Sequence, residues 1–178
     1  KAQVKVIWLL SWHDPAKEKE ATKALVDAKS DVIAMHADTG AAPQAAEELG
    51  VWVVGYNNDM SKYAPKKHLV APVWDWSKVY KYTLENVIKG TWKSSDIWWG
   101  LKEGLVKLSP FNKAVPKDVM ALVESEKSKI IKGEWDVFYG PIKDQKGAVK
   151  VPAGSKMTDK EMLSITWFVE GVQGDIPK

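Results

Sequence analysis

The first half of the chain alternates short apolar segments with amphipathic segments, and this alternation limits the possible folds more than any other feature. Apolar runs of strand length occupy residues 4–10, 31–35, 51–56 and 67–73. Patterns typical of helices follow three of them, at residues 14–28, 38–50 and 76–90. Short strands that are apolar throughout and alternate with helices are typical of parallel sheets. We therefore expect an α/β fold built on a doubly wound parallel sheet.

The turn after the first apolar run is unusual for such a sheet. In a dinucleotide-binding protein the first strand leads into a glycine-rich turn that holds the phosphates. Here the turn at residues 11–15 reads SWHDP and contains no glycine. Asp14 and Pro15 instead have the residue types of a helix N-cap and first helical position. Either the sheet is of another kind, or residues 4–10 are not its first strand.

The second half has a different pattern. Residues 91–112 are rich in glycine, serine and aromatic residues, with weak strand patterns at 96–101 and 104–109. Further along, the patterns predict a helix at 116–135, a hairpin at 136–154 and a short helix at 158–164 capped by Thr158. The last residues, from 165 on, show no clear pattern.

Composition excludes several kinds of site. All 26 basic residues are lysines, the net charge is +3, and the lysines are mixed with acidic residues. Nucleic-acid surfaces usually cluster basic residues and include arginine, so no nucleic-acid partner is expected. The absence of cysteine excludes disulfides, thiolate catalysis and cysteine zinc sites. The ten tryptophans suit stacking on planar ligands, although packing explains most of them.

Polar and aromatic residues follow each predicted strand, where open α/β sheets bind ligands. The four strand ends read SWHD (11–14), HAD (36–38), YNND (56–59) and VWDW (73–76). Rings in these segments could stack on a planar ligand, while amides, imidazoles and carboxylates could bond its edge. The candidate ligand-binding residues are Trp12, His13, His36, Asp38, Asn57, Asp59 and Trp74.

Each candidate also has a structural interpretation. Trp12 could pack in the core, and either histidine could be a hydrogen-bonded structural residue. Asp38, before Thr39 and Gly40, could cap a helix as Asp14 does. One of the two adjacent residues Asn57 and Asn58 fits a turn position.

Metal and catalytic sites find little support. His13, Asp14, His36 and Asp38 could converge, but their spacing matches no metal motif. The chain contains neither a G-x-S-x-G elbow nor a P-loop. We therefore expect no metal, no cofactor and no enzymatic activity.

Several segments resemble one known family. Residues 6–60, which begin VIWLLSWHDP and end VWVVGYNNDM, resemble the C-terminal lobe of the basic membrane protein family of ABC-transporter substrate-binding proteins. Residues 91–112, 131–135 and 140–154 are similar to later parts of the same family. Members of this family are receptors for purine nucleosides and nucleobases and have the type I periplasmic binding protein fold.

The resemblance implies two doubly wound parallel-sheet lobes joined by crossovers. Residues 1–92 would form most of the C-terminal lobe, and residues 93–178 a crossover segment and the completion of the other lobe. The first strand and helix of the C-terminal lobe would precede residue 4, which would explain the turn without glycine. That strand would lie between those of Trp8 and Ile33, so residues 1–178 alone are expected neither to fold stably nor to bind ligand.

The resemblance also implies roles for individual residues. The aromatic residue before the Asp-Pro pair stacks on the purine in this family, which corresponds to Trp12, with His13 beside it. The turn after the next strand corresponds to His36 and Asp38. Nucleoside receptors of the family hold the ribose with an acidic residue where this chain has Asn57. This difference favours a bare base, such as adenine, over a nucleoside.

The predicted function is therefore the extracytoplasmic solute-binding component of an ABC importer. It would be a periplasmic protein or a cell-surface lipoprotein, and its partners would be a purine base or nucleoside, the permease and the missing N-terminal lobe. Two alternatives remain open. One is a nucleoside-acting α/β hydrolase or transferase that uses His13 or His36 as acid and base, and the other is a sugar-binding receptor.

Overall fold

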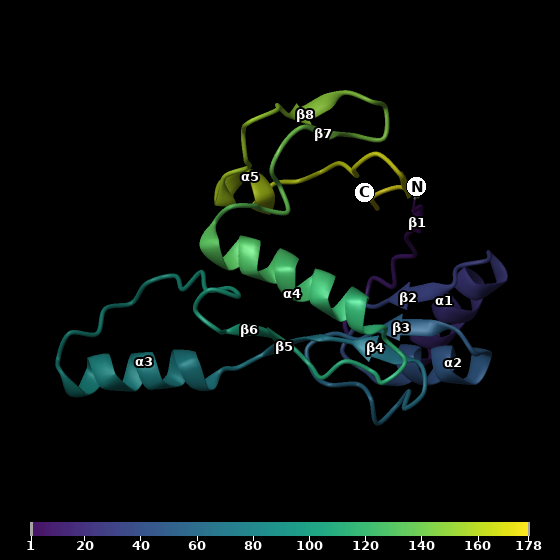
Figure 1. Ribbon diagram of the computed structural model, residues 1–178, viewed down its shortest axis with the longest axis horizontal. Coiled ribbons are helices and arrows are strands. Elements are labelled where there is room, and N and C mark those ends of the chain that lie inside the picture. The colour runs from purple at the N-terminus through teal and green to yellow at the C-terminus, as the bar shows by residue number, and fades with distance from the viewer. Residues whose placement is uncertain (1, 178) are drawn as a thin grey trace.

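The computed structural model describes residues 2–177 and centres on a parallel sheet. Strands β2 (Val32–Ala34), β3 (Trp52–Val54) and β4 (His68–Val70) pair in that order, all in parallel. Helices α1 (Pro15–Asp27) and α2 (Ala41–Leu49) pack against each other beside this sheet (Figure 1). The predicted α/β class is confirmed.

The core lies between these helices and one face of the sheet. Ile33 and Val53 project from neighbouring strands and are buried together with Ala46 of α2 and Ala64. The neighbouring residue Val32, which alternation directs to the opposite face, is 44% exposed. The described chain therefore buries one face of the sheet far more completely than the other.

The predicted boundaries of α1 and the predicted end of α2 are confirmed, but α2 begins at Ala41 with Gly40 as its N-cap, so Asp38 does not cap it. The Asp14 carboxylate accepts a hydrogen bond from the backbone N–H of Lys17 at 3.1 Å, and Pro15 occupies the first helical position. Helix α2 ends at Gly50, whose φ of 76° places it in the left-handed region that glycine adopts without steric cost.

The fourth predicted strand is two strands. Residues 67–73 were expected to be continuous, but β4 ends at Val70 and β5 (Pro72–Trp74) pairs antiparallel with β6 (Val106–Leu108). Pro72 has no backbone N–H to donate, so it cannot continue the parallel ladder. The backbone N–H of the intervening residue, Ala71, donates to the Ser109 hydroxyl at 2.9 Å.

Helix α3 (Ser77–Ile88) projects away from the rest of the molecule (Figure 1). Residues 80, 84, 87 and 88 form one helical stripe. Its side chains, Tyr80, Leu84, Val87 and Ile88, are 54–76% exposed. The strand predicted at residues 96–101 is wrong: this segment runs back along α3 without strand pairing, and Trp99 contacts Tyr82 with ring centroids 5.1 Å apart.

The other predicted elements of the second half are confirmed. Helix α4 (Lys117–Lys132) ends at Gly133, and β7 (Ile142–Lys143) and β8 (Val149–Val151) form the antiparallel hairpin. Helix α5 (Asp159–Leu163) begins with a capping box, because Thr158 and Glu161 bond each other's backbone N–H.

The N-terminal segment departs most from expectation. Residues 4–10 were predicted to form a buried strand of the main sheet, but only Val4–Lys5 form a strand, β1, and it pairs in parallel with β9 (Val172–Gln173) of the tail. Leu10 has a φ of 53°, which ends any extended run, and Leu10 is 80% exposed. The two ends of the chain consequently lie close together (Figure 1).

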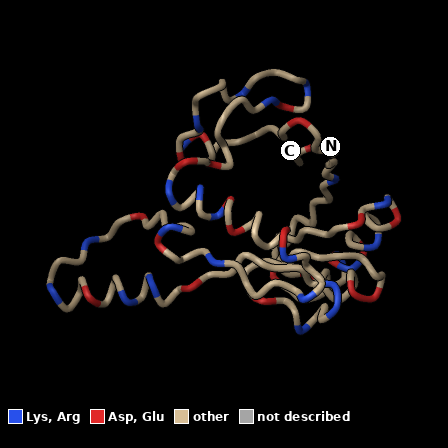
Figure 2. Tube along the Cα trace, in the orientation of Figure 1, with Lys and Arg blue, Asp and Glu red and all other residues tan. Residues whose placement is uncertain are grey.

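Charge and hydropathy add two observations. Lysines and acidic residues are mixed along the chain, including on α3 and α4 (Figure 2). Within residues 2–177, no helix has both the length and the apolar character needed to span a bilayer.

The predicted division of the chain into residues 1–92 and 93–178 stays a prediction. Strand β5 of the first part pairs with β6 of the second.

A substitution at Val53 tests whether the assigned core stabilises the fold. The side chain is 0% exposed and lies among Ile33, Ala46 and Ala64. In the full-length protein, Val53→Ala should lower the free energy of unfolding by about 1.5–3 kcal/mol, through lost burial and a cavity. The half-exposed Val119 of α4 is the matched control, and Val119→Ala should change it by less than about 0.5 kcal/mol. Equal effects in denaturant titrations would contradict the assigned core.

Candidate ligand-binding site

Four aromatic rings form a row that crosses the carboxyl edge of the parallel sheet. His36 and Tyr56 follow β2 and β3, Trp74 ends β5, and Trp12 precedes α1. The ring centroids of Trp12 and His36 are 5.5 Å apart, and those of His36 and Tyr56 are 4.3 Å apart. Tyr56 meets Trp74 edge to face, with centroids 6.1 Å apart and planes at 88°. Parallel pairing causes this arrangement, because it brings the residues after β2 and β3 to the same edge.

A hydrogen-bonded chain runs beside the rings. The Asp38 backbone N–H donates to the Trp12 carbonyl at 2.9 Å, and the Asn57 amide Nδ2 donates to Asp38 Oδ1 at 3.0 Å. Trp74 Nε1 in turn donates to Asn57 Oδ1 at 2.5 Å. Asn57 has a φ of 65°, in the left-handed region that asparagine tolerates better than most residues. Asn57 thus links the ends of β2 and β5.

An open depression of about 340 Å³ adjoins this chain. Its lining consists of Asn57, Asn58, Trp74 and Trp76. Trp76 in this lining is 52% exposed. Trp12, at the end of the row opposite Trp74, is 64% exposed. Exposed rings of this size beside fixed polar groups can stack on a planar ligand and bond its edge.

The structure brings together five of the seven predicted site residues: Trp12, His36, Asp38, Asn57 and Trp74. His13 is exposed beside them, and its backbone N–H donates to the Ser11 hydroxyl at 3.3 Å. Asp59 lies in the turn that follows Asn57 and Asn58, and its Oδ1 accepts a hydrogen bond from the Ser61 backbone N–H. The ligand-binding role of all seven residues stays a prediction.

Sequence reasoning missed Tyr56 as a member of the row. Tyr56 stands two residues after Val54, the last residue of β3, and directly before Asn57. An aromatic residue at that position was a usable signal, because it ends an apolar strand just as Trp12 follows residues 4–10.

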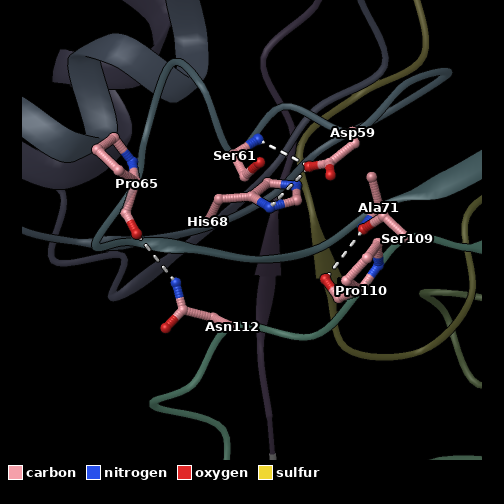
Figure 3. Close-up of polar contacts among 8 residues, drawn as sticks. All are labelled: Asp59, Ser61, Pro65, His68, Ala71, Ser109, Pro110 and Asn112. Atoms are coloured by element: carbon pink, nitrogen blue, oxygen red, sulfur yellow. Dashed lines mark hydrogen bonds and ion pairs between the residues drawn. The ribbon is translucent and has the colours of Figure 1, made fainter.

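In the segment that follows, a buried histidine faces an acidic residue (Figure 3). His68 is 1% exposed, and its Nδ1 lies 3.8 Å from Asp59 Oδ1. The same carboxylate oxygen accepts the Ser61 backbone N–H at 2.9 Å. A Cβ on Gly55 would lie 2.9 Å from His68 Nε2, so glycine allows the loop to close over the imidazole.

These contacts shift two pKa values. Burial lowers the pKa of His68 below 6.5, and the Asp59 charge opposes this shift. The hydrogen bond from the Ser61 backbone lowers the pKa of Asp59 below its ordinary value, and the His68 charge contributes in the same direction. At neutral pH the buried imidazole is therefore uncharged and Asp59 is ionised.

Metal binding finds no support within the described residues 2–177, where no group of three or more His, Asp or Glu side chains could hold an ion.

Comparison with known proteins identifies similar sequences over nearly the whole chain. The sequence profile of the family described as PnrA-like ABC transporter substrate-binding proteins matches residues 1–139. A purine-binding protein of Brucella abortus is 44% identical over 99% of this chain and 50% of its own length. A protein of Haloferax volcanii, provisionally named an ABC transporter glucose-binding protein, is 35% identical over 99% of this chain and 42% of its own length.

Solved structures show a similar fold. A transcriptional activator of the comK gene from Bacillus halodurans superposes with a TM-score of 0.67 at 20% identity, covering 73% of this chain and 47% of its own. An ABC transporter solute-binding protein from Conexibacter woesei superposes with a TM-score of 0.58 at 22% identity, covering 71% of this chain and 43% of its own. The chain spans about half the length of the curated relatives it matches.

The buried imidazole gives the stability of the protein a pH dependence. The unfolded chain binds a proton at His68 with a pKa near 6.5, whereas the folded protein binds it only at lower pH. Lowering the pH from 7.5 to 5.5 should therefore reduce the free energy of unfolding. Once the pH is below the pKa of His68 in both the unfolded and the folded protein, the loss is about 1.4 kcal/mol for each pH unit that separates the two pKa values. Denaturant titrations of the full-length protein at these pH values measure the loss.

Three variants assign this loss to His68. His68→Gln should make unfolding less dependent on pH between 7.5 and 5.5, while His13→Gln, at an exposed position, should leave the dependence unchanged. Asp59→Asn removes the opposing charge and should enlarge the loss. Asp59 itself stabilises the fold above about pH 4, a separate window, because its own pKa is lowered from 3.8. An unchanged pH dependence in His68→Gln would contradict the assignment.

Proposed function

Because the chain belongs to the family of PnrA-like ABC transporter substrate-binding proteins, we propose that it is part of a solute receptor that binds a purine base of the adenine type. The row formed by Trp12, His36, Tyr56 and Trp74 is the observation that carries this proposal. Stacking on such rings contributes about 1–3 kcal/mol per base. The 44% identical relative that is named a purine-binding protein supports the same ligand class.

Polar groups beside the row would select the ligand. The Asp38 carboxylate and the Asn58 amide would lie beside the edge of a base stacked on the row, and the Asn57 amide bonds Asp38. A network of this kind suits a base better than a nucleotide, whose phosphates bind best at cationic groups. Affinity would come from stacking and selectivity from hydrogen bonds.

The complete receptor would work by closure of two lobes on the ligand. The chain spans about half the length of its relatives, so the opposite wall of the site would come from outside these residues. The closed receptor would be extracytoplasmic and deliver the base to an ABC permease. A periplasmic location and attachment as a lipoprotein belong to the same proposal.

A sugar is the second candidate ligand. The relative from Haloferax volcanii is named for glucose, and tryptophan rings also stack on sugars. Enzymatic turnover, with His13 or His36 as acid and base, is a third possibility that the same experiments address. A receptor would release its ligand chemically unchanged.

Ligand identity is tested by mass spectrometry and calorimetry on the full-length protein. We expect a purine base to co-purify unchanged, and adenine to bind at least as tightly as adenosine, because neutral Asn57 offers ribose hydroxyls no charge. Glucose should not compete. A clear preference for adenosine would contradict the bare-base assignment, glucose binding would favour the sugar receptor, and converted adenosine would favour the enzyme.

Trp12 should supply part of the stacking energy. Trp12→Ala should weaken adenine binding by about 1–3 kcal/mol, measured by calorimetry on the full-length protein. Trp98, which is 60% exposed and lies outside the row, is the matched control, and Trp98→Ala should leave the affinity within twofold. Unchanged affinity in Trp12→Ala would remove this ring from the site.

A further inference from the structure

We propose that Asp38 is the group that accepts a hydrogen bond from the ligand and that Asn57 is a positioning residue that aims it. The site would then select bases that present an N–H donor and would disfavour anionic ligands such as nucleotides. This inference rests on the proposed function and names the atom that would give the site its selectivity.

The orientation of the Asn57 amide follows from the chemistry of its neighbours. An indole Nε1–H can only donate, so the atom that faces Trp74 is the amide oxygen. An ionised carboxylate can only accept, so the atom that faces Asp38 is the amide nitrogen. The two requirements agree, and both ends of the amide are engaged inside the protein.

A carboxylate at position 57 would not fit this network. It would place two negative oxygens at the 3.0 Å separation that now joins Asn57 Nδ2 to Asp38 Oδ1. Like charges at this distance repel strongly, and one of the two groups would have to bind a proton. A neutral amide at position 57 avoids this repulsion and donates a hydrogen bond to Asp38 instead.

Asp38 is held on both its backbone and its side chain. Its backbone N–H bonds the Trp12 carbonyl at 2.9 Å, which sets Asp38 beside the exposed stacking ring. The next residue, Thr39, donates its hydroxyl to the carboxylate of Glu18 at 2.6 Å, and Glu18 is 1% exposed. The turn that contains Asp38 and Thr39 is thus hydrogen-bonded to α1 through Glu18, while Asn57 holds Asp38 Oδ1 in place.

The second carboxylate oxygen of Asp38 is left for a ligand. Asp38 is exposed, and within residues 2–177 its side chain makes one hydrogen bond, through Oδ1. Oδ2 can accept but cannot donate, and a bond from a ligand N–H to a charged oxygen is stronger than one to a neutral oxygen. The negative charge at the same point would repel a phosphate.

Calorimetry on the full-length protein with adenine and AMP tests this assignment. Asp38→Asn keeps the shape and can keep the bond from Asn57, but it turns an amide N–H₂ toward the ligand. Adenine affinity should fall at least tenfold, because the bond from its imidazole N9–H to Oδ2 is lost. AMP carries its ribose at N9 and has no such N–H, so AMP affinity should not fall. A structural defect would instead weaken both ligands by the same factor.

A double variant in which the residues at positions 38 and 57 exchange their side chains is the matched control for Asp38→Asn. In Asp38→Asn combined with Asn57→Asp, the bond between the two side chains is reversed, so that a neutral carbonyl oxygen faces the ligand. Adenine affinity should lie between those of the wild type and Asp38→Asn, because an acceptor is restored without its charge. Asn57→Ala, which frees the Asp38 side chain, should reduce the preference for adenine over AMP.

The outcomes separate this inference from the proposed function. If the wild type binds adenine and Asp38→Asn stays within threefold of it, the role of Asp38 is wrong and the proposed function stands. An equal loss for adenine and AMP would also overturn the role of Asp38. If the wild type binds glucose and not adenine, both the proposed function and this inference fail.

Discussion

Parallel pairing of β2, β3 and β4 is the constraint on which the candidate site depends. Parallel strands end at the same edge, so the residues that follow β2 and β3 meet there although about 20 positions separate them. His36 and Tyr56 come from these two ends, and Trp12 and Trp74 extend the row on either side. An antiparallel arrangement of the same strands would send alternate ends to opposite edges.

Parallel pairing alone does not connect the side chains at these strand ends, and hydrogen bonds between side chains do so. Asn57 accepts from Trp74 and donates to Asp38, so one side chain connects β5 to the end of β2. Its left-handed backbone turns the chain at that point, and the buried His68 lies close to Gly55 and Asp59 on either side of it. The candidate site is therefore a surface whose polar side chains are held by contacts within the protein, and Asp59 also accepts a hydrogen bond from the Ser61 backbone.

The surface away from the site is less complete. Val32 on the open face of the sheet, the apolar stripe of α3 and the segment around Leu10 are all exposed in the described chain. Patches of this kind on soluble proteins usually mark surfaces that contact other polypeptide. The curated relatives are about twice as long as this chain, which agrees with a further lobe as the source of that contact.

The sequence by itself determined the local structure. The capping residue Asp14 and the helix-ending glycines Gly50 and Gly133 act over a few residues, and the helices they predicted are present. The ends of β2, β3 and β5, which carry the candidate residues His36, Asp38, Asn57 and Trp74, could also be located, because ligands of open α/β sheets bind at the carboxyl ends of strands.

Tertiary structure decided what depends on partners distant in sequence. Residues 4–10 are as apolar as a buried strand, but a strand exists only where a neighbour pairs with it, and here β9 takes only Val4 and Lys5. The roles of Asn57 and Asp59 also required coordinates, since both are polar residues of one turn. One of them bonds Asp38 and Trp74, the other bonds Ser61 and faces His68, and only packing separates these two outcomes.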